Sequence, residues 1–346
     1  MDKLVVYLRQ KILMKHVSIL ALHEQTNLST VACMVGAYEL FTEANAFCKH
    51  SGKGVKCKVE LVGASTNKSA GNELISLTPH TSIAEVSSTD LIIIPSSLVR
   101  SYEMATKNNK ALIRWIEAQY KQGAEVASMC TGAFLLASTG LLEDKTCSTH
   151  WSVSEHFKLL YPHINLQTDK LITDENGIYT NGGAYSFLHL VIYLIEKYFD
   201  RQTAVYCAKI FQIDLDRNLQ AEFSIFNGHK RHDDDVVLNV QSYLEKNYSD
   251  KVSFEFLSAK FNVGRRNFDR RFIKATGLTP LDYLQRVRVE AAKKSFESSR
   301  KTVSEVMYDV GYNDTKAFRN VFHRITGMSP TEYKFKYSKQ SSLSVR

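Results

Sequence analysis

The stretch NFDRRFIKATGLTPLDY, residues 267–283, is followed fifty residues later by AFRNVFHRITGMSPTEY, residues 317–333. Self-similarity at a fixed period indicates one supersecondary unit used twice. In each copy the sequence predicts that one helix ends at the Thr-Gly pair and that the next helix begins at the Pro. The two copies share Phe268/Phe318, Phe272/Phe322, Thr276/Thr326, Gly277/Gly327, Pro280/Pro330 and Tyr283/Tyr333, always at an offset of 50.

A shorter helix is predicted before each copy. Ser253 can cap the first of these helices, and the sequence TVSE that begins at Thr302 has the pattern of a capping box for the second. Gly311 then ends the second helix and permits a tight turn. The longer helices that follow are predicted over 264–275 and 314–325. The pattern of helix, short turn and helix therefore predicts two helix-turn-helix units in an all-α domain.

Each longer helix has an apolar face for the core and a polar face for a partner. Arg, Lys and Asn side chains suit the edges of guanine and adenine in the major groove. A charged, solvated surface is the alternative for any single residue, but two such faces at one offset favour contact with DNA. The predicted contacts are Arg265, Arg266, Asp269, Arg270 and Lys274 in the first unit and Thr315, Lys316, Arg319, Asn320 and Arg324 in the second.

A helix predicted over 280–296 joins the two units. At about 1.5 Å per residue this helix spans roughly 25 Å. It can therefore hold two recognition helices about one DNA turn, near 34 Å, apart.

Positive charge is concentrated in the same part of the chain. The whole sequence carries a net charge of +8, and residues 229–346 alone hold 23 Lys and Arg against 14 Asp and Glu. The remaining residues are close to neutral. Because the basic excess coincides with the repeat, we expect double-stranded DNA as the partner.

The cysteine pattern and hydropathy limit the class of protein. No two of the six cysteines have the spacing of a zinc or redox motif, and no apolar run reaches the length of a membrane span. The first fifteen residues do not resemble a signal peptide, and Met14 is an alternative start. We expect a cytoplasmic protein without a metal, a cofactor or a membrane partner.

Before the repeat, short apolar strands alternate with helices. The run DLIIIP, residues 90–95, is typical of a buried parallel strand. This alternation predicts a doubly wound α/β domain. Further strands are predicted over 17–22, 55–63, 123–129 and within 177–183, and helices over 29–50, 108–122, from Thr131 onward, 186–198 and 203–211. The predicted organisation is an extension (1–14), an α/β domain (15–226), a linker (227–235), the DNA-binding domain (236–338) and a tail (339–346).

The C-terminal pattern resembles the AraC/XylS-type DNA-binding domain. The matching stretches are FDRRF at 268–272, ATGLTPLDYLQRVRVEAA at 275–292, VSEVMYDVGYND at 303–314 and FRNVFHRITGMSPTEY at 318–333. The resemblance implies transcriptional regulation, with RNA polymerase as a further partner. It also implies base reading by Arg266, Asp269, Arg270, Thr315, Lys316, Arg319 and Asn320. Gly264 departs from the Ser that usually caps the first recognition helix in this family.

The N-terminal domain contains the pattern of a nucleophile elbow. Cys130 follows a predicted strand and precedes a helix, where a sharp turn presents one side chain and favours a thiolate. Residues 123–151 and 180–199 resemble the ThiJ/PfpI-like domain of GlxA-type AraC regulators. This resemblance implies a flavodoxin-like sheet, a small-molecule sensor and a homodimer.

Three departures from the hydrolytic relatives argue against catalysis. Thr131 stands where they place His after the nucleophile, Cys33 stands at the position of their acid, and Ser96-Ser97 replace their Gly-Gly. We therefore assign no catalytic residue, and a Cys-dependent amidase or glyoxalase-like enzyme remains the alternative. If the alignment is right, the Cys33 and Cys130 sulfurs lie close together and can form a reversible disulfide; two buried thiols without a role are the alternative.

The cleft at the carboxyl ends of the strands is the predicted ligand site. Members of this family often sense amino acids or related nitrogenous metabolites, and aromatic rings suit a cationic amine. Core packing is the alternative for the same aromatic residues. The predicted lining is Cys130, Thr131, His150, Trp151, Ser96, Ser97 and Tyr185.

Overall fold

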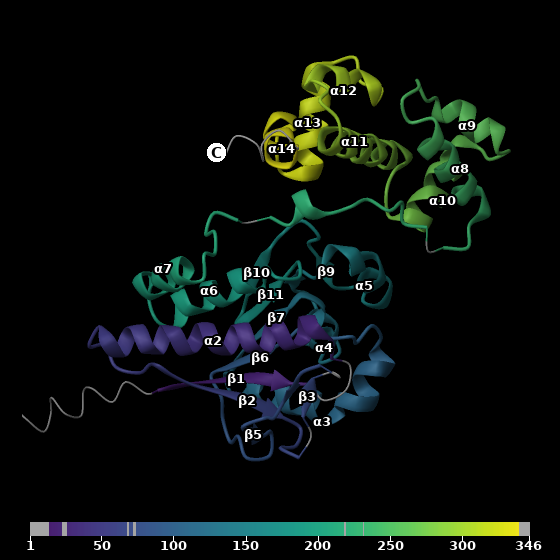
Figure 1. Cartoon of the computed structure of the whole chain (residues 1–346). Helices are drawn as coiled ribbons and strands as arrows, with labels where there is room; N and C mark the ends of the chain where they lie inside the picture. The colour runs from purple at the N-terminus through teal and green to yellow at the C-terminus, as the bar shows by residue number, and fades with distance from the viewer. Residues whose placement is uncertain are drawn as a thin grey trace, which may run out of the picture. The chain divides into compact units, whose positions relative to one another are not determined.

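The chain forms two compact units, Met1–Gln220 and Ala221–Arg346 (Figure 1). The structure, a computed structural model, describes residues 14–22, 26–67, 69–71, 74–217, 219–230 and 232–338. Most of the predicted extension and the whole predicted tail lie outside these residues.

The first unit is built on a seven-stranded sheet with the order β10-β11-β7-β6-β1-β2-β5. Neighbouring strands are parallel except β10 and β11, which form an antiparallel pair at one edge. Two further pairs of short strands lie outside the sheet. The strands are β1 (Lys15–Ala21), β2 (Cys57–Gly63), β3 (Ala70–Gly71), β4 (Ser76–Leu77), β5 (Thr81–Ser82), β6 (Leu91–Ile94), β7 (Glu125–Met129), β8 (Thr146–Cys147), β9 (Asn165–Leu166), β10 (Ile172–Glu175) and β11 (Ile178–Asn181).

Helices cover both faces of the sheet, because alternate residues of its strands point to opposite sides. Val17 and Ile19 of β1 join one buried cluster, and Leu20 joins the other. The first cluster contains α2 (Leu28–His50), α6 (Phe187–Tyr198) and α7 (Arg201–Ile210). The second contains α3 (Tyr102–Lys121), α4 (Ala133–Ala137) and α5 (Ser154–Leu160). The prediction of a flavodoxin-like, doubly wound sheet is therefore confirmed.

Local differences from the predicted elements have clear causes. Helix α3 begins at Tyr102, earlier than predicted, because the Ser101 side chain accepts a hydrogen bond from the Met104 amide and caps it. Three short 3₁₀ turns, η1 (Cys130–Gly132), η2 (Trp151–Val153) and η3 (Ala221–Phe223), have no periodicity that a sequence could reveal.

The second unit contains two small cores joined by a shared helix (Figure 1). Helix α11 (Pro280–Ser298) contributes its first turns to one core and its later turns to the other. The remaining helices are α8 (Asp235–Lys246), α9 (Phe254–Lys260), α10 (Arg265–Thr276), α12 (Val303–Asp309), α13 (Thr315–Thr326) and α14 (Pro330–Tyr337). We call α9 with α10 the first helix pair, and α12 with α13 the second helix pair.

The described residues of 221–234 (221–230 and 232–234), which we call the strap, pack onto the helical unit. The predicted linker, 227–235, therefore differs from a free spacer over its described residues. The buried Lys293 donates a hydrogen bond to the Ser224 carbonyl at 2.6 Å, and the Gln241 amide donates to the Gly228 carbonyl at 2.5 Å. Arg271 of α10 also donates two hydrogen bonds to the Asp234 carboxylate, of 2.8 and 2.9 Å.

Gln220 ends the first unit and is fully buried there. Its side-chain amide donates to the Thr149 carbonyl at 2.9 Å and to the Ser148 hydroxyl at 3.2 Å. A Cβ atom on Gly182 would lie only 2.0 Å from the Gln220 amide nitrogen, so glycine is required there for Gln220 to fit.

Candidate functional site

Helix α13 is fixed at both ends and presents one polar face. Asp314 caps it by accepting a hydrogen bond from the Ala317 amide at 2.5 Å, and Gly327 ends it with a φ of 76°. The buried Phe318 and Phe322 hold the opposite face in the core. All five predicted contacts on this helix are exposed, as are Ala317 and His323; the five are Thr315, Lys316, Arg319, Asn320 and Arg324.

These exposed side chains differ in their freedom to contact a partner. Arg324 donates to Asp282 at 3.3 Å and to Gln285, both on α11. Among the described residues, Lys316, Arg319 and Asn320 have no side-chain hydrogen bond or ion pair. They can therefore reach another molecule without breaking an interaction within the protein.

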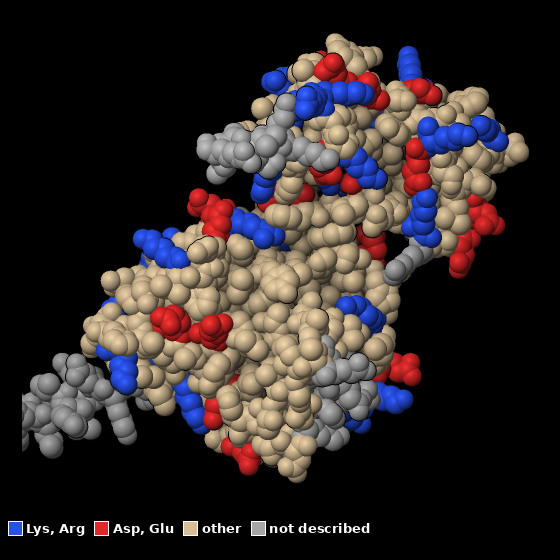
Figure 2. All heavy atoms as spheres, viewed as in Figure 1, with Lys and Arg blue, Asp and Glu red and all other residues tan. Residues whose placement is uncertain are grey.

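Helix α10 presents a face on which three of the five predicted contacts already have a side-chain partner within the helix. Arg265 forms an ion pair with Asp269 at 2.6 Å, and Arg270 donates to Asn267 at 3.0 Å. Gly264 starts this helix without a side-chain cap, as its departure from the family pattern implied. Arg266 and Lys274 are exposed and complete the predicted set. On the face of the helical unit in view in Figure 2, Lys and Arg also lie beside Asp and Glu.

In the first unit, Cys130 occupies a strained turn at the end of β7. Its φ is 54°, in the left-handed region that non-glycine residues rarely adopt. A Cβ atom on Gly132 would lie 2.6 Å from the Pro95 carbonyl oxygen, so the turn is pressed against the loop after β6. This geometry is that of the elbow predicted from the sequence.

Thr131 joins the elbow to that neighbouring loop. Its hydroxyl donates to the Ser97 carbonyl at 2.7 Å and accepts from the Ser97 amide at 3.1 Å. The Ser96 hydroxyl lies 3.0 Å from the same oxygen. The hydroxyl of Thr131 is therefore engaged in holding two loops together.

Burial dominates the environment of the Cys130 thiol. Burial raises the pKa of Cys130, and this outweighs hydrogen bonds from Thr131 and Ser96 and the charge of Arg100, which lower it. Burial also raises the pKa of Cys33 to about 12, with a further contribution from Cys130. The expectation of a thiolate at the elbow is therefore wrong, because burial dominates. The closeness of the Cys33 and Cys130 sulfurs and their reversible disulfide remain predictions.

Arg100 is a part of this site that sequence reasoning missed. It donates to the carbonyls of Ser97 and Val99 at 2.6 and 2.7 Å, and its guanidinium lies 5.6 Å from the Phe134 ring centre. It is the only charged residue between Asp90 and Glu103, which was an available signal. Its charge acts on Cys130 and also on His150.

His150 is arranged as a structural group. Its Nδ1 lies 2.8 Å from the Ser152 hydroxyl, and its ring lies 5.4 Å from that of Trp151. Burial, followed by the charge of Arg100, lowers the pKa of His150.

The other predicted ligand residues differ in exposure, because Ser96 and Ser97 are buried whereas Tyr185 is 67% exposed. This set remains a prediction. Among the described residues, no three His, Cys, Asp or Glu side chains gather as a metal site.

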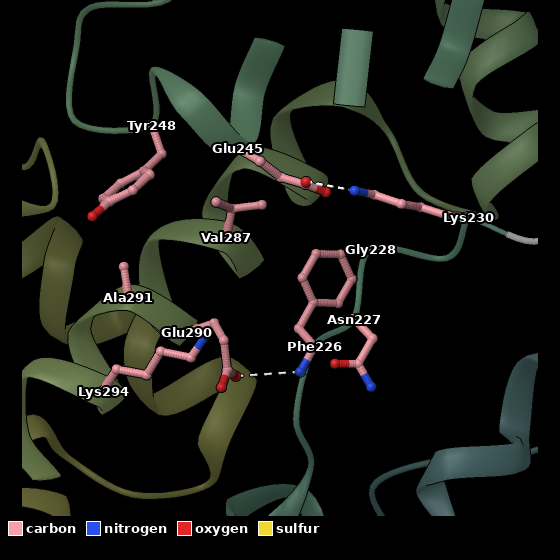
Figure 3. Close-up of a pocket in the computed structure, with 10 residues that line it drawn as sticks. All are labelled: Phe226, Asn227, Gly228, Lys230, Glu245, Tyr248, Val287, Glu290, Ala291 and Lys294. Carbon is pink, nitrogen blue, oxygen red and sulfur yellow. Dashed lines mark hydrogen bonds and ion pairs between the residues drawn. The ribbon is translucent and has the colours of Figure 1, made fainter. Parts of the chain in front are cut away.

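A separate cavity of about 460 Å³ lies within the helical unit, between the strap, α8 and α11 (Figure 3). Its two carboxylates are already engaged: Glu245 pairs with Lys230 at 2.6 Å, and Glu290 accepts from the Phe226 amide at 3.2 Å. The sequence did not predict this cavity, because the strap read as a linker. The full lining is Phe226, Asn227, Gly228, Lys230, Glu245, Tyr248, Val287, Glu290, Ala291 and Lys294.

Comparison with known proteins defines the class to which these two units belong. The DJ-1/PfpI family matches residues 30–197, and a helix-turn-helix domain family matches residues 257–335. The chain thus has an N-terminal domain of the DJ-1/PfpI type and a C-terminal helix-turn-helix domain of the AraC type, as the two resemblances implied. No helix of the described residues is long and apolar enough to cross a membrane.

The most similar proteins include named transcriptional regulators. The chain is 24% identical over 221 residues to the HTH-type transcriptional regulator GbdR of Pseudomonas aeruginosa, covering 64% of this chain and 60% of that protein. It is 23% identical over 214 residues to GlxA of Rhizobium meliloti, covering 60% and 64%. The matched region therefore spans less than two thirds of these relatives. A crystal structure from Vibrio parahaemolyticus shares the fold, with a TM-score of 0.50, 23% identity, and coverage of 57% of this chain and 98% of that one.

Proposed function

We propose that this protein is a sequence-specific DNA-binding transcriptional regulator. The observation that carries the proposal is the free polar face of α13, where Lys316, Arg319 and Asn320 lie opposite a buried aromatic face. Arg and Asn form paired hydrogen bonds with guanine and adenine, and Lys neutralises phosphate. The similarity to the HTH-type transcriptional regulators GbdR and GlxA supports it.

The helix pairs enter DNA as two modules. Helix α13 reads bases in one major groove, and α10 contributes Arg266 and Arg270 in the next. Helix α11 spans roughly 28 Å for its 19 residues, which suits grooves one DNA turn apart. The strong excess of Lys and Arg in this unit supplies the salt-dependent part of the affinity.

The first unit senses a small molecule and forms a homodimer in the cytoplasm, and RNA polymerase is a further partner. The ligand site is the region around Cys130, Ser96 and Trp151, where β6 and β7 end. The rings of Trp151 and Tyr185 suit an amino acid or another cationic amine.

An enzyme of the Cys-dependent amidase type is the second candidate, favoured only by the strained elbow at Cys130. Two features weigh against it. The pKa of the Cys130 thiol is raised. His150 is the base that the sequence offered, and its Nδ1 already forms a hydrogen bond with Ser152. Iodoacetamide labelling of the native chain at pH 7 tests this alternative. We expect iodoacetamide to label Cys130 slowly, because its thiol is buried. Fast labelling would favour the enzyme.

Selection of duplexes from a random pool by the full-length chain tests the main proposal. We expect a motif with two elements about ten base pairs apart, and affinity that falls steeply with salt. Asn320→Ala should relax the preference within one element, whereas Arg266→Ala should relax it within the other. Failure to enrich any sequence at low salt would overturn the proposal.

The sensor role needs its own measurement. Thermal unfolding of the full-length chain is followed with a panel of amino acids and quaternary amines. One of them should raise the midpoint, and Trp151→Leu should abolish the shift. Ligand binding to the native chain that is unaffected by Trp151→Leu and Ser96→Ala would exclude this cleft.

A further inference from the structure

Arg288 lies on α11 where the two cores of the helical unit meet. Its Nε donates to the Tyr248 carbonyl at 2.8 Å, and a terminal nitrogen donates to the Asp250 carbonyl at 3.0 Å. Tyr248 and Asp250 follow α8 and precede the first helix pair. One guanidinium therefore fixes the loop that leads into that pair.

The same guanidinium contacts the turn of the second helix pair. It lies 5.1 Å from the centre of the Tyr312 ring, which is buried against Phe318 of α13. A Cβ atom on Gly311 would meet an Arg288 nitrogen at 2.9 Å and the Ser249 carbonyl at 2.5 Å. The turn of one helix pair is thus pressed directly against the entry loop of the other.

We infer that Arg288 is a positioning residue that sets the distance and angle between the two recognition helices, α10 and α13. The inference rests on the proposed DNA-binding function and assigns the choice of half-site spacing to this junction. A single helix such as α11 bends and twists, and two small cores share only that helix as a continuous element. A group bound to both pairs at once removes this freedom.

Arginine suits this task because its planar fork binds two carbonyls while one face rests on an aromatic ring. Lysine has one compact charge and cannot hold both carbonyls in the same geometry. Loss of the fork leaves the Tyr248 and Asp250 carbonyls without this donor and frees the Tyr312 ring. The recognition helices then keep their own folds and lose their mutual alignment.

A distance measurement tests the inference without DNA. Lys274→Cys on α10 and Lys316→Cys on α13 accept spin labels at exposed sites, whereas the six native cysteines are all buried. The label-to-label distribution in the full-length chain should be narrow and should broaden in Arg288→Met and in Arg288→Lys. Lys294→Met, which removes an exposed charge from the same helix, should leave it unchanged. An Arg288→Met distribution identical to that of the parent overturns the inference.

A DNA measurement tests the consequence. Five base pairs inserted between the two elements of the selected sequence turn one element through half a helical turn. The parent chain should lose affinity strongly, and Arg288→Met should show a penalty roughly tenfold smaller, because a flexible link tolerates misplacement. Equal penalties overturn the inference.

The two experiments separate its failure from that of the proposed function. If the parent selects no DNA sequence, the function fails, and the spin-label distances still decide on Arg288. Should Arg288→Met unfold, Tyr312→Leu keeps both carbonyl bonds, removes the ring, and is expected to broaden the same distribution.

Discussion

The two helix pairs have separate cores of the same design and differ in their turns and in their surfaces. In each, an aromatic ring of the recognition helix packs edge-on against a tyrosine, Phe272 on Tyr283 and Phe322 on Tyr333. Each tyrosine hydroxyl donates to a glutamate at 2.6 Å. The two copies thus have the same residues where side chains are buried, because side-chain volume and hydrogen bonding constrain buried positions most.

The turns between the helices differ in length. The first pair has four residues between α9 and α10, with Asn262 in the left-handed conformation at a φ of 53°. The second has five residues between α12 and α13 and uses Gly311 at a φ of 81°. The helices before the turns are therefore offset by 49 residues, and those after by 50. The two recognition helices can therefore differ in direction relative to the helix before them, although the cores are alike.

Their surfaces differ in charge pairing. Asp269 occupies the position that corresponds to Arg319, and it neutralises Arg265 within α10. Arg319 has no such partner among the described residues. A side chain without a partner gains more binding free energy from a contact with a base than a side chain that must first break an ion pair. We therefore expect the second helix pair to contribute more to base reading.

The largest expected effect concerns the crowded turn. Gly311→Ala should destabilise the helical unit by about 3 kcal/mol, because the new methyl group meets the Ser249 carbonyl at a positive φ. Urea unfolding of the full-length chain measures this. Asn262→Ala, which has the same backbone demand without the crowding, should cost about 1 kcal/mol. Equal costs would show that the two turns are equally constrained.

The next effect concerns DNA affinity. Arg319→Ala should weaken binding to the selected sequence by about 2 kcal/mol, the value of a good contact to a base. Arg270→Ala should cost about 1 kcal/mol, because Arg270 already spends a hydrogen bond on Asn267. Fluorescence anisotropy at fixed salt provides both values. A larger loss for Arg270 would reverse the ranking of the two helices, and no loss for either would remove both from the interface.

Helix capping gives a smaller contrast. Asp314→Ala removes a side-chain cap and should cost about 1 kcal/mol. Gly264→Ser adds a cap where the first pair has none and should gain about 0.3 kcal/mol. Both are measured by urea unfolding, and a loss of stability on Gly264→Ser would mean that the cap conflicts with the local turn.

The smallest expected loss of stability depends on pH. Arg271 binds Asp234 and lowers the pKa of that carboxyl group; the second pair has Val321 at the matching position. A depressed pKa stabilises the fold above the unfolded value near 3.9, and this contribution is lost as pH falls through the folded pKa. Both side chains are partly exposed, so Arg271→Met should cost only about 0.5 kcal/mol at pH 6 and less at pH 3. A cost independent of pH would exclude the ion pair as its cause.

Much of this architecture was predictable from the sequence. Thr302 and Gly311 signal a helix start and a helix end through local chemistry, which needs no knowledge of the fold. The repeat at an offset of 50 revealed the paired cores, because Phe and Tyr recur where they are buried. The free polar face of α13 followed from the same periodicity.

Other features depend on contacts that sequence periodicity does not record. The part of the strap from Asn227 onward is polar and charged, so it was predicted to be a linker, and residues 221–226 were assigned to the α/β domain. Arg271 and Lys293 bind the strap from distant parts of the sequence. Arg100 has a role only because β6 ends beside the elbow. The turn at Cys130 was predicted from local sequence, whereas its raised pKa comes from burial by the assembled domain.

The burial of Gln220 bears on what fixes the backbone at the end of the first unit. This side chain is locked into the first unit, and the next residue, Ala221, begins a turn that Lys336 holds onto the second through Glu222 at 2.7 Å. Each contact is made within its own unit, so packed side chains hold the backbone where the first unit ends and the second begins. Gln220→Ala would therefore take a donor away from buried acceptors of the first unit, and its cost would be a loss of stability of that unit.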